Sequence, residues 1–376
     1  MSLAPPTSPR LHGRSRSLSP NPRQGTTSSP SLPQLLAPPM RTTSLTPSPR
    51  LTRHSWSPAH SPTLHHHVRS TLNLFYRSKD SPSGQQLHLA ALQGNIELLK
   101  RTLDGGRVHI DSQDKEGTTP LILAAANNHY GCVRELLDQG ASPHIRRHTG
   151  TCALFFAAQG GFLDIVKLLL DKGAPVEHPP DGGTPLFVAC QCNHLAVVRE
   201  LLGRGANIHA TMADGATPLF IAAQNGHCKL LRFLLSKGAN ENQIRKDRAT
   251  PLWIASQMGH ADIVKELLDA GAQVDAARED GATPLFKAAH KGHVEVVRSL
   301  VNHGATFELL NNGESALHAA ALFGHLKVVK DLVAAGANVN LKNKEGQTPA
   351  ELARDAGYDV IAEFLLKARP SYQTTV

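Results

Sequence analysis

Apolar residues return along this sequence at intervals of 32 to 34 residues. The clearest series is a leucine that opens a short apolar run, and its members are Leu121, Leu154, Leu186, Leu219, Leu252, Leu285 and Leu317. Leu87 and Ala350 extend the series by one step at each end. The pattern predicts nine copies of one structural unit, none of which can bury its apolar face alone.

The start of each unit has the signals of a turn followed by a helix. In one copy, Asp214-Gly215 is a turn signal, Thr217 can cap a helix, and Pro218 can occupy the first helical position. The short apolar run that follows predicts a first helix over residues 218–224.

A second helix follows in the same unit. Residues 229–237 carry apolar side chains three and four positions apart, which predicts an amphipathic helix. Gly226 and Gly238 are placed to end the two helices in a left-handed conformation. Asn128 and Asn193 replace glycine at the equivalent of position 226, and asparagine is the next most tolerant residue there.

The phrase Thr-Pro-Leu-x-x-Ala, the Gly-His after the first helix and the Gly-Ala after the second resemble the ankyrin repeat. The resemblance covers roughly residues 84–369. It implies an all-α fold with short β-hairpin fingers, in which nine repeats stack as a solenoid. We therefore divide the chain into a tail (1–82), a repeat array (83–369) and a C-terminal segment (370–376).

The resemblance implies a module that binds proteins and is not an enzyme. Each repeat of such an array contacts only its neighbours, and no cluster of acid, base and nucleophile can be identified in the sequence. We expect no catalytic residue, no metal site and no cofactor. The partner is expected on the hollow side, which the fingers and first helices line.

Two series of ring side chains recur at fixed repeat positions. One is aromatic and comprises Phe155, Phe187, Phe220, Trp253 and Phe286; the other comprises His129, His194, His227, His260, His293 and His325. We interpret the first as a buried ladder between helices, with ligand stacking as the alternative. The histidines are expected to be structural hydrogen-bonding residues and not metal ligands, because each lies in a different repeat.

Partner-binding residues are expected where the repeats differ while their frame stays fixed. The candidates on the fingertips are basic and favour an acidic partner, with ordinary solvated charges as the alternative: Arg146, Arg147, Arg245, Lys246 and Arg248. The candidates on the concave side are apolar, as binding surfaces often are: Met258, Leu309 and Phe323.

Two asparagines match a modification site that the resemblance implies. Ankyrin arrays can be hydroxylated on a finger asparagine, and Asn340 and Asn242 occupy that position. The acidic residue usual two positions earlier is Asn338 or Asn240 here. Hydroxylation of Asn340 or Asn242 is therefore a hypothesis that departs from the family pattern.

The positive charge of the chain is concentrated in residues 1–82. They hold nine arginines and Lys79 against Asp80 alone, a net charge of +9, whereas the rest holds 29 basic and 30 acidic residues. We therefore expect no nucleic acid to bind to the array. The tail is rich in Pro, Ser, Thr and Arg without apolar periodicity, and it is predicted to be disordered.

The tail also contains candidate phosphorylation sites. Arginine stands three residues before Ser17, Ser19 and Ser44, and Ser57 precedes a proline. The sequences around the first three resemble sites read by phosphoserine-binding adaptors, so such an adaptor is a second candidate partner.

Cysteine usage and hydropathy argue against a disulfide- or zinc-stabilised protein and against a membrane-spanning protein. The five cysteines are odd in number and irregularly spaced, which predicts neither a disulfide framework nor a zinc site. No run of 18 apolar residues occurs, so no membrane span is expected. The Arg- and Ser-rich start has some likeness to an organellar transit peptide, but its prolines would break the required helix.

The last residues match a short peptide motif. A PDZ domain binds a free carboxylate, an apolar last residue and a hydroxyl two positions before it, which Val376 and Thr374 supply. The alternative is a frayed end that binds nothing.

Together these features predict a cytoplasmic adaptor whose array holds one protein while the two tails recruit others. The alternative is a nuclear transcriptional co-regulator, in which the array binds a transcription factor and the basic tail is a localisation signal.

Overall fold

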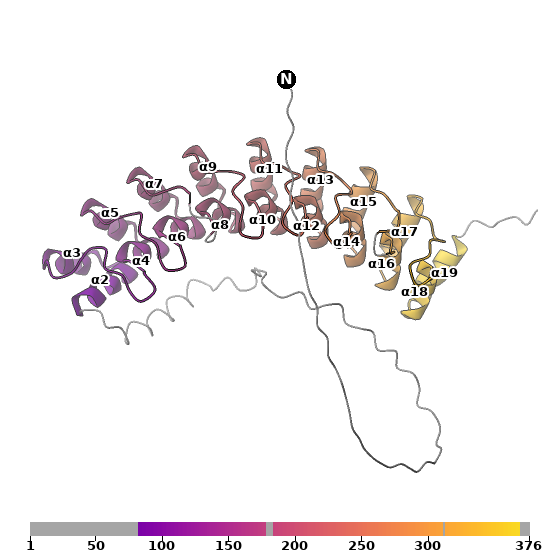
Figure 1. Ribbon diagram of the computed structural model, residues 1–376, viewed down its shortest axis with the longest axis horizontal. Coiled ribbons are helices and arrows are strands. Elements are labelled where there is room, and N and C mark those ends of the chain that lie inside the picture. Colours follow the sequence, from indigo (N-terminus) through magenta and orange to yellow (C-terminus); the bar gives the residue numbers. More distant parts are fainter. Residues whose placement is uncertain (1–81, 178–182, 311–312, 369–376) are drawn as a thin grey trace, which may run out of the picture. The chain divides into compact units, whose positions relative to one another are not determined.

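The computed structural model describes residues 82–177, 183–310 and 313–368. These residues form eighteen α-helices in nine consecutive pairs (Figure 1). The first helices are α2 (Pro82–Gln93), α4 (Pro120–Ala126), α6 (Ala153–Gly160), α8 (Pro185–Gln191), α10 (Pro218–Gln224), α12 (Pro251–Met258), α14 (Pro284–Lys291), α16 (Ala316–Leu322) and α18 (Pro349–Asp355). The second helices are α3 (Ile96–Asp104), α5 (Tyr130–Asp138), α7 (Leu163–Asp171), α9 (Leu195–Gly203), α11 (Cys228–Ser236), α13 (Ala261–Asp269), α15 (Val294–Asn302), α17 (Leu326–Ala334) and α19 (Asp359–Lys367).

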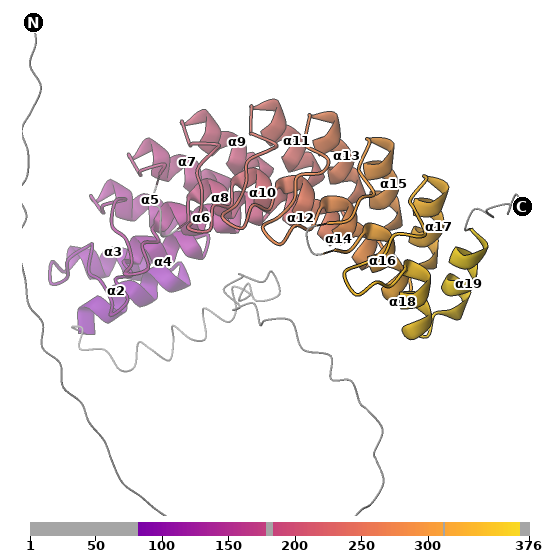
Figure 2. The same ribbon diagram turned by 45° about the vertical axis from the view of Figure 1, so that its right-hand side comes forward.

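The pairs stack side by side, so that the helices form two rows (Figure 1). Each helix packs against its partner within the pair, and each first helix packs against the first helices of the neighbouring pairs. The second helices pack on one another in the same way, except that α9 and α11 make fewer contacts than the other neighbours. Within this stack the first helices lie on the hollow side and the second helices on the outer side (Figure 2). The arrangement confirms the predicted solenoid of nine repeats.

The predicted helix signals are used as expected. Thr217 Oγ1 accepts a hydrogen bond from the Phe220 amide at 3.1 Å, and Pro218 is the first residue of α10. The same threonine–proline start is found at α4, α8, α12, α14 and α18. Asn128 and Asn193 have φ values of 60° and 62°, which confirms that they stand in for glycine in the left-handed region.

The aromatic series is buried, as predicted. None of its five side chains is more than 9% exposed. In the described residues no ring contact joins two of its members, and charged side chains from the fingers lie over two of the rings. Arg245 lies 5.3 Å from the centroid of Phe220, and Arg278 lies 5.3 Å from that of Trp253.

The histidine series joins neighbouring repeats. Each imidazole donates Nε2–H to a backbone carbonyl at the end of the preceding first helix, at 3.0 to 3.1 Å. His293, for example, bonds to the carbonyl of Gln257, and His325 to that of His290. The interpretation as structural hydrogen-bonding residues is confirmed.

The fingers are hydrogen-bonded turns without β-strands in the described residues, where only an isolated bridge between Arg146 and Cys152 occurs. Two backbone bonds close a finger, as from the Arg245 amide to the Ala249 carbonyl at 3.0 Å and from the Arg248 amide to the Arg245 carbonyl at 2.8 Å. Some fingers are also linked to the one before by a single bond, such as Lys246 N–H to Asp214 O at 2.9 Å. These few bonds do not form a strand ladder, so the expected hairpins are turns.

None of the helices in the described residues combines the length and the apolar character that a bilayer crossing requires.

Candidate functional site

The inner side of repeats six to eight carries exposed apolar residues at one register position. Met258 ends α12 and Phe323 follows α16, and each is 44% exposed. Lys291, at the end of α14, occupies the same position in the repeat between them and is also exposed. We call these three residues, with Lys287 and His290 of α14, the inner patch.

His290 links the inner patch to the core. Its ring lies 4.2 Å from the Phe323 ring and 6.4 Å from that of Phe286, measured between centroids. Its Nδ1 is buried and has no hydrogen-bond partner. Burial lowers the pKa of His290, and Lys287, Lys291 and His325 lower it further, so that the ring is neutral at neutral pH.

Lys287 is a half-buried cation in the same patch. Its Nζ lies 5.7 Å from the Trp253 ring and 5.9 Å from the Phe286 ring, so that two aromatic side chains surround the ammonium group. Burial lowers its pKa, and the attraction of Asp280 opposes that shift. No carboxylate in the described residues forms an ion pair with it. A partly desolvated cation that forms no ion pair favours an approaching anion.

Two of the predicted fingertip arginines are already engaged within the chain. Arg147 pairs with Glu116, donates Nε–H to Thr118 Oγ1 at 3.1 Å and lies over Phe156. Arg245 pairs with Asp247 at 2.5 Å and lies over an aromatic ring of the core. Their guanidinium groups therefore stabilise the fingers, and less of their charge is left for a partner.

Arg248 and Lys246 are exposed, by contrast, and Arg248 has an unusual backbone. Its φ is +64°, whereas glycine occupies the equivalent position of the other described fingers: Gly117, Gly150, Gly215, Gly281, Gly313 and Gly346. A left-handed conformation costs a non-glycine residue about 1 kcal/mol or more. A charged side chain is thus kept at a strained fingertip, as is common at binding sites.

Asp247 joins two neighbouring fingers. Its carboxylate accepts from Arg245 and also from Arg278 at 3.1 Å. The hydrogen bond from Arg245 lowers the pKa of Asp247 to about 2. The structure therefore brings Arg245 and Arg278 together through one acidic side chain, a pairing that the sequence did not reveal.

Replacing Asp247 with asparagine is expected to lower the free energy of unfolding by about 1 kcal/mol near pH 7, because two arginines lose their shared carboxylate. The folded-state pKa is lowered, so the contribution is full above about pH 4 and is lost as the pH falls toward 2. Urea unfolding of both proteins at neutral pH and near pH 2 measures it. Asp280→Asn is the control with the smaller effect, because Asp280 pairs with Arg278 alone, and an effect of D247N that persists near pH 2 would contradict the assignment.

The remaining predicted surface residues are placed as follows. Leu309 lies in the finger before α16, and its side chain is 41% exposed. Asn242 is engaged between two fingers, since its Nδ2 donates to Gly271 O at 3.2 Å and its Oδ1 accepts from the Gln273 amide at 2.8 Å. Asn340 is exposed. Hydroxylation of Asn242 would compete with hydrogen bonds that the fingers already use.

Several predicted positions lie outside the described residues. They are the tail over residues 1–81 with Ser17, Ser19, Ser44 and Ser57, and the C-terminal residues Thr374 and Val376.

No group of three or more metal-ligating side chains is gathered within residues 82–177, 183–310 and 313–368. The five cysteines, all in those ranges, are free thiols, and burial raises the pKa of each. These thiols are therefore protonated at neutral pH.

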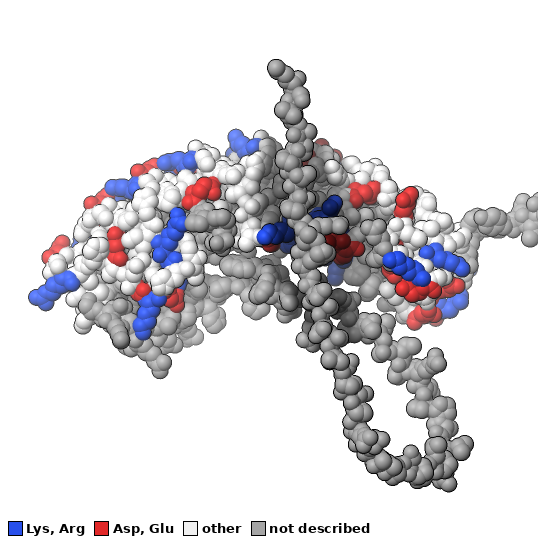
Figure 3. All heavy atoms as spheres, viewed as in Figure 1, with Lys and Arg blue, Asp and Glu red and all other residues white. Residues whose placement is uncertain are grey.

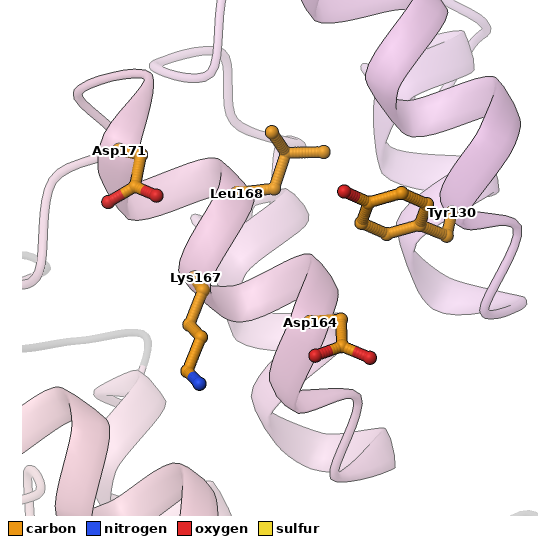
Figure 4. A pocket seen from close by; sticks show the side chains of 5 residues that line it. All are labelled: Tyr130, Asp164, Lys167, Leu168 and Asp171. Carbon is orange, nitrogen blue, oxygen red and sulfur yellow. The ribbon is translucent and has the colours of Figure 1, made fainter.

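A shallow depression lies on the outer row, between α5 and α7 (Figure 4). Its volume is about 330 Å³, and Figure 4 shows the Tyr130 ring facing Leu168 while Lys167 points away. The charges around it are mixed, and Asp171 is already paired with Arg204 at 2.7 Å. Charge of a single sign therefore does not mark this depression as a binding site.

Charges of both signs are interspersed over the face of the described residues that Figure 3 shows. This face does not have the continuous basic stripe that is typical of surfaces that bind a nucleic-acid backbone.

Sequence reasoning missed Lys287 and His290. The signal for Lys287 was available, because the same register position holds Val188, Ile221 and Ile254 in the three preceding repeats. A lysine at a position that is apolar in the neighbouring repeats is a local exception to the repeat pattern. Nothing in the sequence alone indicated that His290 would contact Phe323.

A family model for three copies of the ankyrin repeat matches six overlapping segments, over residues 87–179, 136–212, 175–245, 205–278, 252–343 and 306–375. Ankyrin repeat domain-containing protein 29 of Danio rerio and of Homo sapiens is 49% identical over 69 residues, 18% of this chain and 23% of that protein. The human transient receptor potential cation channel subfamily A member 1 is 33% identical over 123 residues, 32% of this chain and 11% of that protein.

The Mus musculus B-cell lymphoma 3 protein homolog is 31% identical over 132 residues, 34% of this chain and 29% of that protein. In each case the matched part is less than a third of the relative's length.

Proposed function

This chain belongs to the ankyrin repeat family, and on that premise we propose that it is a scaffold that holds a partner protein on the inner patch of repeats six to eight. The family binds proteins through its repeats, and no catalytic family is indicated.

The observation that carries the proposal is the inner patch itself. Met258 and Phe323 expose apolar surface on either side of Lys291, in one register. Lys287 is a partly desolvated cation beside them. Exposed apolar groups next to positive charge that forms no ion pair favour a segment that combines apolar and acidic side chains.

The fingers support the same kind of partner. Lys246 and Arg248 are exposed, and the strained backbone of Arg248 is maintained although glycine would relieve it. An acidic segment lying along the inner side would meet these two charges as well as Lys287.

Proximity labelling with the full chain, in parallel with a Met258→Ser, Phe323→Ser double variant, tests this function. We expect the variant to lose at least one labelled protein, and its affinity for that protein, once purified, to fall by about tenfold or more. Val360→Ser is the control, because Val360 is 68% exposed but lies on α19 in the outer row. An unchanged set of labelled proteins in the double variant would reject the inner patch as the binding surface.

The two tails extend the scaffold to an adaptor. We propose that Val376 and Thr374 bind a PDZ domain and that phosphorylated Ser17, Ser19, Ser44 or Ser57 binds a phosphoserine-reading adaptor. Two further arms of the labelling experiment, one without residues 371–376 and one with these serines changed to alanine, separate these partners from that of the inner patch.

We place the adaptor in the cytoplasm. The net charge of +9 in residues 1–82 favours a second candidate, a nuclear co-regulator with a basic localisation signal. Fusion of residues 1–82 to a fluorescent reporter distinguishes them, since nuclear accumulation of the reporter would favour the second.

A further inference from the structure

Ion pairs join successive repeats on the outer side of the stack. In each pair a cation of one repeat meets an acidic side chain of the next or the preceding repeat, at 2.7 to 3.6 Å. The pairs are Lys100–Glu135, Lys172–Asp138, Arg204–Asp171, Arg232–Glu266, Arg298–Asp331 and His303–Asp269. They recur at two register positions, one in the middle of the second helix and one at its end.

The junction of α9 and α11 has a cation but no acidic side chain at each of these two positions. Gly203 stands where the preceding repeat has Asp171 and where the repeat two further on has Asp269. Phe233 stands where the next repeat has Glu266. The two cations that these acids would neutralise, Arg199 and Lys237, therefore have no carboxylate partner in the described residues.

These substitutions open a groove with a cationic rim and an apolar floor. Its volume is about 420 Å³, and it is lined by Arg199, Leu202, Gly203, Ile208, Phe233 and Lys237 among others, with no acidic side chain. A Cβ added to Gly203 would meet no atom within 4 Å, so the missing side chain is replaced by open space. We call this site the outer groove.

The two cations converge on one ring. The Arg199 guanidinium carbon lies 4.2 Å from the centroid of Phe233, and the Lys237 Nζ lies 5.8 Å from it. Cation–π contact compensates part of each charge but leaves the N–H donors without an anionic acceptor.

We propose that the outer groove binds a phosphotyrosine side chain of a partner polypeptide. A phosphate monoester carries close to two negative charges at neutral pH, which matches the two unpaired cations, and arginine binds phosphate through paired N–H donors. The aromatic ring of the ligand would contact Phe233, Leu202 and Ile208. The volume lies within the usual range of small binding sites.

This site is separate from the inner patch. The outer groove is formed by second helices and the loops that follow them, whereas the inner patch is formed by first helices. The inference goes beyond the scaffold function, and either can fail without the other.

The test uses the purified full chain and a fluorescein-labelled tripeptide, Leu-phosphotyrosine-Leu, followed by fluorescence anisotropy. We expect saturable binding, and we expect the tyrosine and phosphoserine versions to bind at least about tenfold more weakly. Arg199→Gln and Gly203→Asp are each expected to weaken binding by about tenfold or more, by loss of a donor and by repulsion of the phosphate.

Gly203→Asp also controls for folding. The new carboxylate can pair with Lys237 as Asp171 pairs with Arg204, so thermal unfolding is expected to be unchanged or shifted upward. Arg232→Gln, one repeat further on, removes an arginine that is already paired with Glu266 and should leave peptide binding unchanged. Phe323→Ser, in the inner patch, should also leave it unchanged.

Three results would overturn the proposal. They are equal binding of the phosphoserine and phosphotyrosine peptides, wild-type affinity in both Arg199→Gln and Gly203→Asp, and binding of phosphoinositide vesicles without binding of the peptide.

Discussion

Gly259→Ala is expected to lower the free energy of unfolding by about 3 kcal/mol, from a strained backbone and a steric clash together. Gly259 has φ +83°, a region that alanine adopts only at a cost. An added Cβ would lie 2.7 Å from the imidazole of His293. That ring cannot move away without breaking its hydrogen bond to the Gln257 carbonyl, which joins two repeats.

Gly304→Ala is the matched control for this prediction. Gly304 has almost the same backbone, with φ +84°, but an added Cβ would meet nothing within 4 Å. Its cost should be limited to the backbone, about 1 kcal/mol. Urea unfolding of both variants, followed by circular dichroism, compares them, and equal destabilisation would show that the histidine contact adds nothing.

The helix pairs and their turns could be predicted from the sequence because the same local signals recur in every repeat. Thr217, Pro218 and Gly226 determine the ends of the first helix through local interactions, and nine approximate copies of the unit each predict the same helix pair. The residues that replace glycine, Asn128 and Asn193, also obey local rules. The expected role of the histidines was correct for the same reason, although their acceptors depend on the neighbouring repeat.

Contacts between repeats could not be predicted in the same way. The basic fingertips were expected to face a partner, but Arg147 and Arg245 are paired with acidic side chains of the fingers. Phe233 and Gly203 stand at positions that hold an acidic residue in some other repeats, yet the importance of this difference depends on knowing that the two positions meet across a junction. The same holds for His290, whose contact with Phe323 spans two repeats.

The exposed apolar candidates lie between these two cases. The prediction that Met258, Leu309 and Phe323 would be exposed is correct, because register alone placed them on the solvent-facing side. Their joint action on one partner remains a prediction. In the described residues the structure places the Phe323 ring against that of His290.

Trp253→Ala is expected to lower the free energy of unfolding by about 4 kcal/mol, the usual cost of removing a large buried aromatic side chain. The side chain is 3% exposed, and its Nε1–H donates to the Ala282 carbonyl at 2.8 Å. Arg278 lies over the ring at 5.3 Å, and Lys287 lies 5.7 Å from it. The substitution therefore removes packing, an inter-repeat hydrogen bond and the aromatic contact of two cations together.

Trp253→Phe separates these contributions. Phenylalanine occupies the same register position in the repeats on either side, as Phe220 and Phe286, so packing and an aromatic face are largely retained. Only the hydrogen bond to Ala282 is lost, which should cost about 1 to 2 kcal/mol. Urea unfolding of both variants measures the difference. If Trp253→Phe is as destabilising as Trp253→Ala, the hydrogen bond between repeats is the main contribution of this residue, and the packing of the aromatic series is secondary.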